Sequence, residues 1–170
     1  MEADQGPVEV LVANAGVTRD TLLALMSEDA FAEVLDTNLA GAYRVAKRAV
    51  RGMMRMRRGR LVFISSVVGM YGSAGQANYA SSKAGLVGLA RSLARELGSR
   101  GITSNVVAPG FVDSDMTANL SEERKAAIIS AVPLGRDGVP AEVAARNLHA
   151  EGHLADGARQ GKVITMEMRQ

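Results

Sequence analysis

Residues 60–65 read Arg-Leu-Val-Phe-Ile-Ser, a short apolar run that ends at Ser66. Two more runs of this kind, rich in valine, occupy residues 8–13 and 103–108. Continuous β-branched runs bounded by Gly, Pro or Ser are typical of a parallel sheet that is covered on both faces. We therefore predict three parallel strands in an α/β protein.

Longer amphipathic stretches separate these runs. Ser27 is followed by two acidic residues and is a predicted helix N-cap. The apolar spacing predicts long helices over 39–57 and 77–97, two short helices over 121–145 and a last strand over 161–166. This alternation of strands and helices implies right-handed crossovers and a doubly wound sheet.

The composition predicts one domain, residues 1–170, and argues against several classes of protein. Of the 170 residues, 47% are hydrophobic and 22% are charged, which argues against disorder. No apolar stretch approaches the length of a membrane span, and we expect no signal peptide. Cysteine is absent, which excludes disulfides and fits a cytoplasmic location. The net charge of +2 requires no polyanionic partner, so we expect no nucleic-acid binding.

Polar and glycine-containing segments stand where the predicted strands end. They are Asn14-Ala15-Gly16, Ser65-Ser66 and Pro109-Gly110. In an open parallel sheet, ligands bind outside the carboxyl ends of the strands. One such segment would be ordinary turn chemistry, but three along one edge predict a crevice that binds a ligand.

The segment Tyr79-Ala80-Ser81-Ser82-Lys83 carries the sharpest chemical signal. Residues four apart share a helix face, so Tyr79 and Lys83 are predicted to lie side by side. A free tyrosine has a pKa of about 10, and a cation within roughly 4–6 Å lowers it. Bringing that pKa to about 7 takes about 4 kcal/mol, which a lysine joined by a cationic cofactor ring would supply. The alternative is two side chains on an exposed helix face.

Two further polar residues, Ser66 and Asn38, are candidates for the same site. The Ser66 hydroxyl, at a strand end, is a candidate to hydrogen-bond a carbonyl oxygen that gains negative charge. Its alternative is a turn serine. Asn38 lies near a predicted helix start, where the alternative is an N-cap.

In this order and spacing, these motifs resemble the short-chain dehydrogenase/reductases. Segments 66–69, 75–79 and 105–111 further resemble the 3-oxoacyl-[acyl-carrier-protein] reductase branch, and the resemblance covers about residues 5 to 145. It implies a Rossmann-like fold and an NAD(P)-dependent oxidoreductase. No protein side chain transfers hydride, so this chemistry requires a cofactor.

The resemblance implies a role for each catalytic candidate. Tyr79 would protonate the carbonyl oxygen as hydride arrives, and Lys83 would lower the pKa of Tyr79 and hold the nicotinamide ribose. Ser66 would position the carbonyl, and Asn38 would order a water in the proton relay behind Lys83. Besides Tyr79 and Lys83, the implied cofactor-binding residues are Asn14, Ala15, Gly16, Pro109, Gly110, Val112 and Ser114. The implied cofactor is NADP (as NADPH) in preference to NAD.

The chain departs from the family pattern at both ends. It resembles the family from the fourth strand onward, so we expect a partial Rossmann-like fold without the first βαβαβ half and its glycine-rich phosphate turn. Gly69-x-x-Gly72-x-x-Gly75 has the wrong spacing for that turn and is interpreted as a substrate loop. Residues 146–170 are interpreted as an atypical tail. We therefore expect that this chain alone does not bind dinucleotide tightly.

The resemblance implies NADPH-dependent reduction of 3-oxoacyl thioesters on acyl carrier protein, in fatty acid biosynthesis, by a homotetramer. The alternatives are another ketone substrate, or a non-catalytic chain that only associates with full-length subunits. The arginine cluster over 51–60 has three possible functions. It complements the partial charge of a helix C-terminus, docks an acidic carrier protein through Arg57 and Arg100, or binds RNA. The lack of aromatic residues among the arginines disfavours RNA binding. His149 and His153 lack a third ligand, so no metal site is expected.

Overall fold

The computed structural model describes residues 6–113, 117, 121–132, 134–145 and 163–165. Within these residues the core is a parallel sheet of four strands in the order β1-β2-β3-β4. The strands are β1 (Val10–Ala13), β2 (Gly59–Ile64), β3 (Ile102–Ala108) and β4 (Val163–Thr165). The three predicted strands and the predicted last strand are therefore confirmed. Because all four run parallel, their carboxyl ends meet at one edge of the sheet.

The strand β2 lies at the centre of the core. In the register of the sheet, Leu61 of β2 pairs with Leu11 of β1 on one side and with Ser104 of β3 on the other. Every residue of β2 except Arg60 is buried. A strand covered on both faces needs no alternation of apolar and polar residues, which explains the continuous apolar run.

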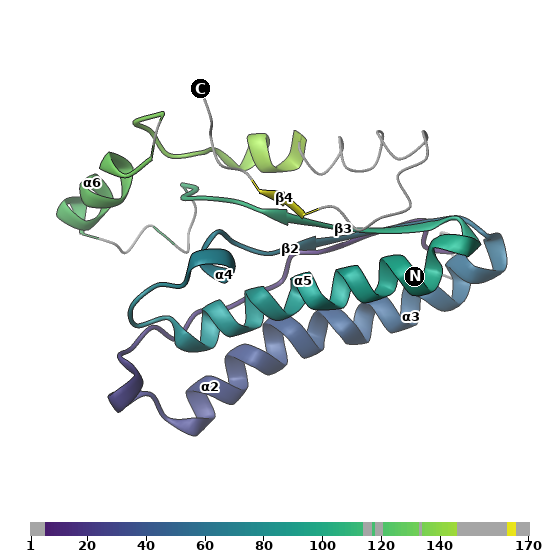
Figure 1. The fold of residues 1–170 in the computed structure, drawn as a ribbon, viewed down its shortest axis with the longest axis horizontal. Coiled ribbons are helices and arrows are strands. Elements are labelled where there is room, and N and C mark those ends of the chain that lie inside the picture. Colours follow the sequence, from purple (N-terminus) through teal and green to yellow (C-terminus); the bar gives the residue numbers. More distant parts are fainter. Residues whose placement is uncertain (1–5, 114–116, 118–120, 133, 146–162, 166–170) are drawn as a thin grey trace.

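Two long helical segments cover one face of the sheet (Figure 1). The first is α2 (Glu28–Leu35), which continues through the π-helical turn η2 (Asp36–Ala40) into α3 (Gly41–Met56); the second is α5 (Ala77–Leu97). On this face Met53 packs in one cluster with Leu61 and Phe63 of the sheet. The Ser27 hydroxyl accepts a 3.2 Å hydrogen bond from the Ala30 amide, so the predicted N-cap is confirmed.

The opposite face of the sheet is covered by the later part of the chain. Val62 and Ile64 alternate with Leu61 and Phe63 along β2 and therefore point the other way. The helical residues 140–145 place Val143 against them. This helix follows α6 (Glu122–Ser130), so the two short helices predicted over 121–145 are confirmed. Helices on both faces make the fold doubly wound, as predicted.

Three short elements complete the described part of the chain. They are η1 (Leu23–Leu25), α4 (Val68–Tyr71) and η3 (Gly98–Arg100). Residues 69–75 are interpreted from the sequence as a loop, but α4 makes their first part helical. In the part of the chain that the structure describes, no helix is long and apolar enough to cross a membrane.

Alanine substitutions at two glycines should separate backbone strain from close packing. Gly101 and Gly135 have positive φ angles of +72° and +64°, which cost an alanine roughly 1–2 kcal/mol. At Gly101 the added Cβ would also overlap the Arg57 carbonyl oxygen, whereas nothing lies within 4 Å at Gly135. We expect Gly135→Ala to lower the free energy of unfolding by about 1 kcal/mol and Gly101→Ala by about 3 kcal/mol, measured by urea denaturation. Equal losses would contradict the close approach of Gly101 to Arg57.

Candidate active site

Lys83 joins α5 to the carboxyl end of β2. Its Nζ donates a 2.8 Å hydrogen bond to the Ile64 carbonyl, and the Ser65 hydroxyl donates a 2.8 Å bond to the Lys83 carbonyl. Lys83 is only 4% exposed, and this burial lowers its pKa from 10.5 to about 8. The helix therefore holds an ionisable amine directly beside the strand end.

Tyr79 lies one helical turn before Lys83, whose Nζ is 5.5 Å from the centre of the tyrosine ring. Burial raises the pKa of Tyr79 above its ordinary value of 10.0, a hydrogen bond with Ser66 lowers it, and the charge of Asp20 raises it. The net effect is a raised pKa. Burial is the largest of these causes because it disfavours the charged phenolate. The predicted lowering by Lys83 together with a cationic cofactor ring stays a prediction.

Ser66 reaches this helical turn from the end of β2. Its hydroxyl accepts a 3.2 Å hydrogen bond from the Val68 amide and interacts with the Tyr79 phenol. The next glycine, Gly69, lies so close to α5 that an added Cβ would stand 2.9 Å from backbone atoms of Lys83 and Ala84. Gly69 thus lets the segment after β2 rest on the turn that carries Lys83. The sequence pattern places Gly69 only in a substrate loop and does not show this contact.

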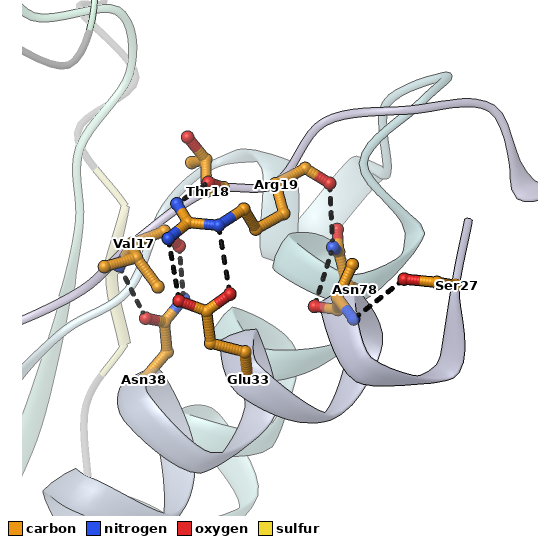
Figure 2. Close-up of polar contacts among 8 residues, drawn as sticks. Val17, Thr18, Arg19, Ser27, Glu33, Asn38 and Asn78 are labelled. Atoms are coloured by element: carbon orange, nitrogen blue, oxygen red, sulfur yellow. Dashed lines mark hydrogen bonds and ion pairs between the residues drawn. The ribbon is translucent and has the colours of Figure 1, made fainter. Parts of the chain in front are cut away.

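Asn38 lies in the π-helical turn η2 and is 1% exposed. The alternative of a helix N-cap is wrong, because α2, η2 and α3 follow one another without a break. Its Oδ1 accepts a 2.8 Å bond from the Val17 amide, and its Nδ2 donates 3.0 Å bonds to the Val17 carbonyl (Figure 2) and to the Ser82 hydroxyl. These contacts tie the segment after β1 to α5. The predicted role in ordering a water stays a prediction.

Gly16, at the end of β1, lies beside two of these polar side chains. A Cβ added to Gly16 would lie 3.2 Å from Asn38 Oδ1 and 3.4 Å from Lys83 Nζ. Asn14 and Ala15, which precede it, are exposed. Gly16 therefore lies beside the catalytic candidates, and the exposed Asn14 and Ala15 lie at the same strand end.

The end of β3 joins the same edge of the sheet. The Val67 amide donates a 2.9 Å hydrogen bond to the Pro109 carbonyl, which places Pro109 and Gly110 next to the segment that carries Ser66. Val112 follows and forms an isolated bridge with Gly138. Ser114, the last predicted cofactor contact, lies outside the described residues.

The two predicted partner-binding arginines lie at the opposite edge of the sheet. Arg57 ends α3 just before β2, and Arg100 ends η3 just before β3. The Arg57 guanidinium donates a 3.2 Å bond to the Ser99 carbonyl, so the two exposed arginines are near neighbours.

The structure adds no support for a metal site. His149 and His153 lie outside the described residues. Among the residues that it does describe, no group of three or more His, Cys, Asp or Glu side chains is placed to hold a metal ion.

Comparison with known proteins gives consistent matches. A family model described as short chain dehydrogenase matches residues 1–125. The 3-oxoacyl-[acyl-carrier-protein] reductase FabG of Salmonella typhimurium is 52% identical over 144 residues, which cover 85% of this chain and 59% of that protein. The reductases MabA of Mycobacterium avium and Mycobacterium tuberculosis are 52% and 53% identical over 84% and 85% of this chain, and 56% and 58% of their own lengths. The chain thus spans less than two thirds of these relatives.

The lowered pKa of Lys83 should make the stability of the fold depend on pH. Above about pH 8 the folded chain loses the Lys83 proton, whereas the unfolded chain keeps it up to about pH 10.5. Because the unfolded state then binds more protons, stability should rise with pH across this window, by about 3 kcal/mol at most. Urea unfolding at a series of pH values measures the rise.

Two substitutions test the assignment of this rise to Lys83. Lys83→Met keeps the length of the side chain without its charge and should abolish the rise. Lys47→Met, at an exposed position of α3, should preserve it. A rise that survives Lys83→Met would contradict the assignment.

The pKa of Tyr79 should respond to Asp20 and Ser66 with opposite signs. Replacing Tyr43 and Tyr71 by Phe leaves Tyr79 as the sole tyrosine of a chain without tryptophan, a variant that we call the single-tyrosine background. In it, Asp20→Asn should lower the pKa because a nearby negative charge is removed. Ser66→Ala should raise it because a hydrogen bond is lost. Ultraviolet absorbance of the phenolate follows the titration, and shifts of the same sign would refute this picture.

Proposed function

Because the chain belongs to the short-chain dehydrogenase family, we propose that it contributes the catalytic residues of an NADPH-dependent reductase of 3-oxoacyl thioesters. The proposed substrates are carried by acyl carrier protein, since the relatives named above are 3-oxoacyl-[acyl-carrier-protein] reductases. The observation that carries the proposal is the meeting of Ser66, Tyr79 and Lys83 at the end of β2. The product would be the 3-hydroxyacyl thioester.

Tyr79 is proposed as the acid. Its raised pKa keeps the phenol protonated at neutral pH, so that it has a proton to give. The nicotinamide cofactor, when bound, supplies the hydride to the carbonyl carbon. The Ser66 hydroxyl holds the carbonyl oxygen beside the phenol and stabilises the negative charge that develops there. The proton then passes from Tyr79 Oη to that oxygen and completes the alcohol.

Lys83 is proposed to stabilise the phenolate that remains. With a pKa of about 8 it is mostly cationic at neutral pH, and its charge lies 5.5 Å from the ring centre. Among the described residues, its ammonium has one hydrogen-bond acceptor, the Ile64 carbonyl. An ammonium has three donors, so the others can serve the ribose hydroxyls of the cofactor.

Gly16 has no side chain, which leaves space at the end of β1 for the ribose that Lys83 is proposed to hold. A Cβ on Gly16 would occupy the space beside Asn38 Oδ1 and Lys83 Nζ. In the proposal, Asn14, Ala15 and Gly16 line the adenosine side of NADPH, and Asn38 supports the proton relay. The residues proposed to contact the nicotinamide are Pro109, Gly110, Val112 and Ser114.

The carrier protein is proposed to dock at the edge of the sheet that holds Arg57 and Arg100. Both arginines are exposed, and the hydrogen bond of Arg57 to Ser99 brings it to the residue next to Arg100. Two adjacent cations favour association with an acidic surface. Assembly into a homotetramer is part of the same proposal, and exposed apolar residues of α3 such as Tyr43 and Val45 offer a surface for it.

A fusion tests the catalytic proposal. This chain, joined behind the N-terminal portion of the Salmonella relative, should oxidise NADPH in the presence of an acetoacetyl thioester. Tyr79→Phe keeps the ring but removes the proton donor, so kcat should fall by about 10²–10⁴-fold. The loss of NADPH absorbance measures the rate. No turnover by the fusion would favour a chain that only associates with intact subunits, and a Tyr79→Phe loss under about tenfold would refute the acid role.

The same fusion distinguishes the proposed substrates. Arg57→Glu with Arg100→Glu should raise KM for a carrier-bound thioester and leave KM for a small free thioester unchanged, because only the carrier protein meets these residues. An equal change for both substrates would count against docking there. Faster turnover of free ketones than of thioesters would favour the alternative of another ketone substrate.

A further inference from the structure

Asn78 is a polar residue with 0% exposure that the proposed chemistry does not use. It directly precedes Tyr79 in the first turn of α5. Figure 2 shows its side chain turned toward Arg19 and α2. We call residues 16–21, the segment between β1 and η1, the strap.

The Asn78 carboxamide joins three segments of the chain. Its Nδ2 donates a 2.9 Å hydrogen bond to the Arg19 carbonyl of the strap and a 3.5 Å bond to the Ala30 carbonyl of α2 (Figure 2). Its Oδ1 accepts a 2.8 Å bond from the Tyr79 amide. The donor and acceptor groups of one buried side chain therefore hold the strap, α2 and α5 together.

The contact with Tyr79 has a particular reason at this position. The first amides of a helix have no partner within the helix, and the Tyr79 amide is one of them. The residue at the N-cap, Gln76, provides no side-chain cap. Asn78 satisfies the amide instead, so the backbone of the turn that carries Tyr79 depends on it.

The strap is also held by Asn38 at Val17 and by a backbone bond from the Thr21 amide to the Gly75 carbonyl. Two further side-chain contacts of the strap are exposed. Gln76 Nε2 donates a 2.7 Å bond to Asp20, and Arg19 makes an ion pair with Glu33 at 2.7 Å. Exposed polar pairs contribute little because water competes for both partners. A buried donor that loses its partner is costly, so Asn78 is the stronger anchor.

The strap matters for Tyr79 because it brings a negative charge near the phenol. Asp20, the residue after Arg19, is the anionic group that acts on Tyr79, and Lys83 is the cationic group beside its ring. A strap that leaves its place would take Asp20 away.

We propose that Asn78 is a positioning residue that sets the place of Tyr79 by holding the strap and α2 against the first turn of α5. It acts through the strap and through the Tyr79 backbone, without contact with the reacting atoms. This inference rests on the proposed function only for the catalytic importance of Tyr79. The positioning itself can be measured without cofactor or turnover.

The test is Asn78→Ala in the single-tyrosine background. Release of the strap should lower the pKa of Tyr79 toward its ordinary value, because Asp20 moves away. Amide exchange at Val17 and Thr21, whose N–H groups bond to Asn38 and Gly75, should accelerate at least about tenfold relative to β3 amides. Ultraviolet titration and hydrogen exchange followed by NMR give the two readouts.

The matched control is Leu97→Ala in the same background. Leu97 is 2% exposed and lies at the other end of α5, so its truncation removes core packing without touching the strap. This variant should lose stability while the pKa of Tyr79 and the relative exchange of Thr21 stay unchanged. An equal shift in the control would reduce Asn78 to a purely structural role and overturn the proposal.

The remaining outcomes are also decisive. An unchanged Tyr79 pKa in folded Asn78→Ala overturns the proposal, whatever the exchange rates. If circular dichroism shows that this variant is unfolded, Asn78→Ser, which keeps a hydroxyl donor, replaces it in the same comparison. Failure of both variants to fold also overturns the proposal, because Asn78 would then serve the whole fold. An inactive fusion would contradict the proposed function and leave the titration result standing.

Discussion

Lys83 is buried at the end of β2, and its amine there determines how α5 and the sheet come together. An ammonium removed from water needs a close polar partner, and the Ile64 carbonyl at the end of β2 supplies it. The Ser65 hydroxyl binds the same helical turn, and Gly69 leaves room for the backbone after β2 to rest on it. These contacts hold α5 to the strand end, and Tyr79 meets Ser66 as a consequence.

The strap is the second support of the site, and two buried asparagines hold it. Asn38 binds the backbone of Val17 near one end, and Asn78 binds the carbonyl of Arg19 near the other. A carboxamide both donates and accepts hydrogen bonds, so it can satisfy backbone groups that have no partner in a helix or sheet. The polar residues around Tyr79 therefore organise the chain as well as the chemistry.

Sequence patterns predicted the elements well where the signal is local. The apolar runs located β1, β2 and β3. In β2 and β3 the run is continuous because both faces are buried, whereas the edge strand β1 leaves Val10 and Val12 exposed on one face. Residues around Ser27 located the start of α2, because a cap acts within one turn. The same patterns placed a helix start near Asn38, whereas α2, η2 and α3 form one continuous helical segment that contains it. Nothing in the residue spacing marks a π-helical turn.

Residue patterns along the chain were enough to predict the strand and helix order, the family resemblance and the shared helix face of Tyr79 and Lys83. These properties follow from short motifs, each a few residues long, and from the order of those motifs along the chain. The packing of distant segments, in contrast, raises the pKa of Tyr79 by burial, rests Gly69 on α5 and lets Asn78 anchor the strap. Desolvation and hydrogen bonds of this kind depend on segments that are distant in the chain, so the spacing of neighbouring residues does not predict them.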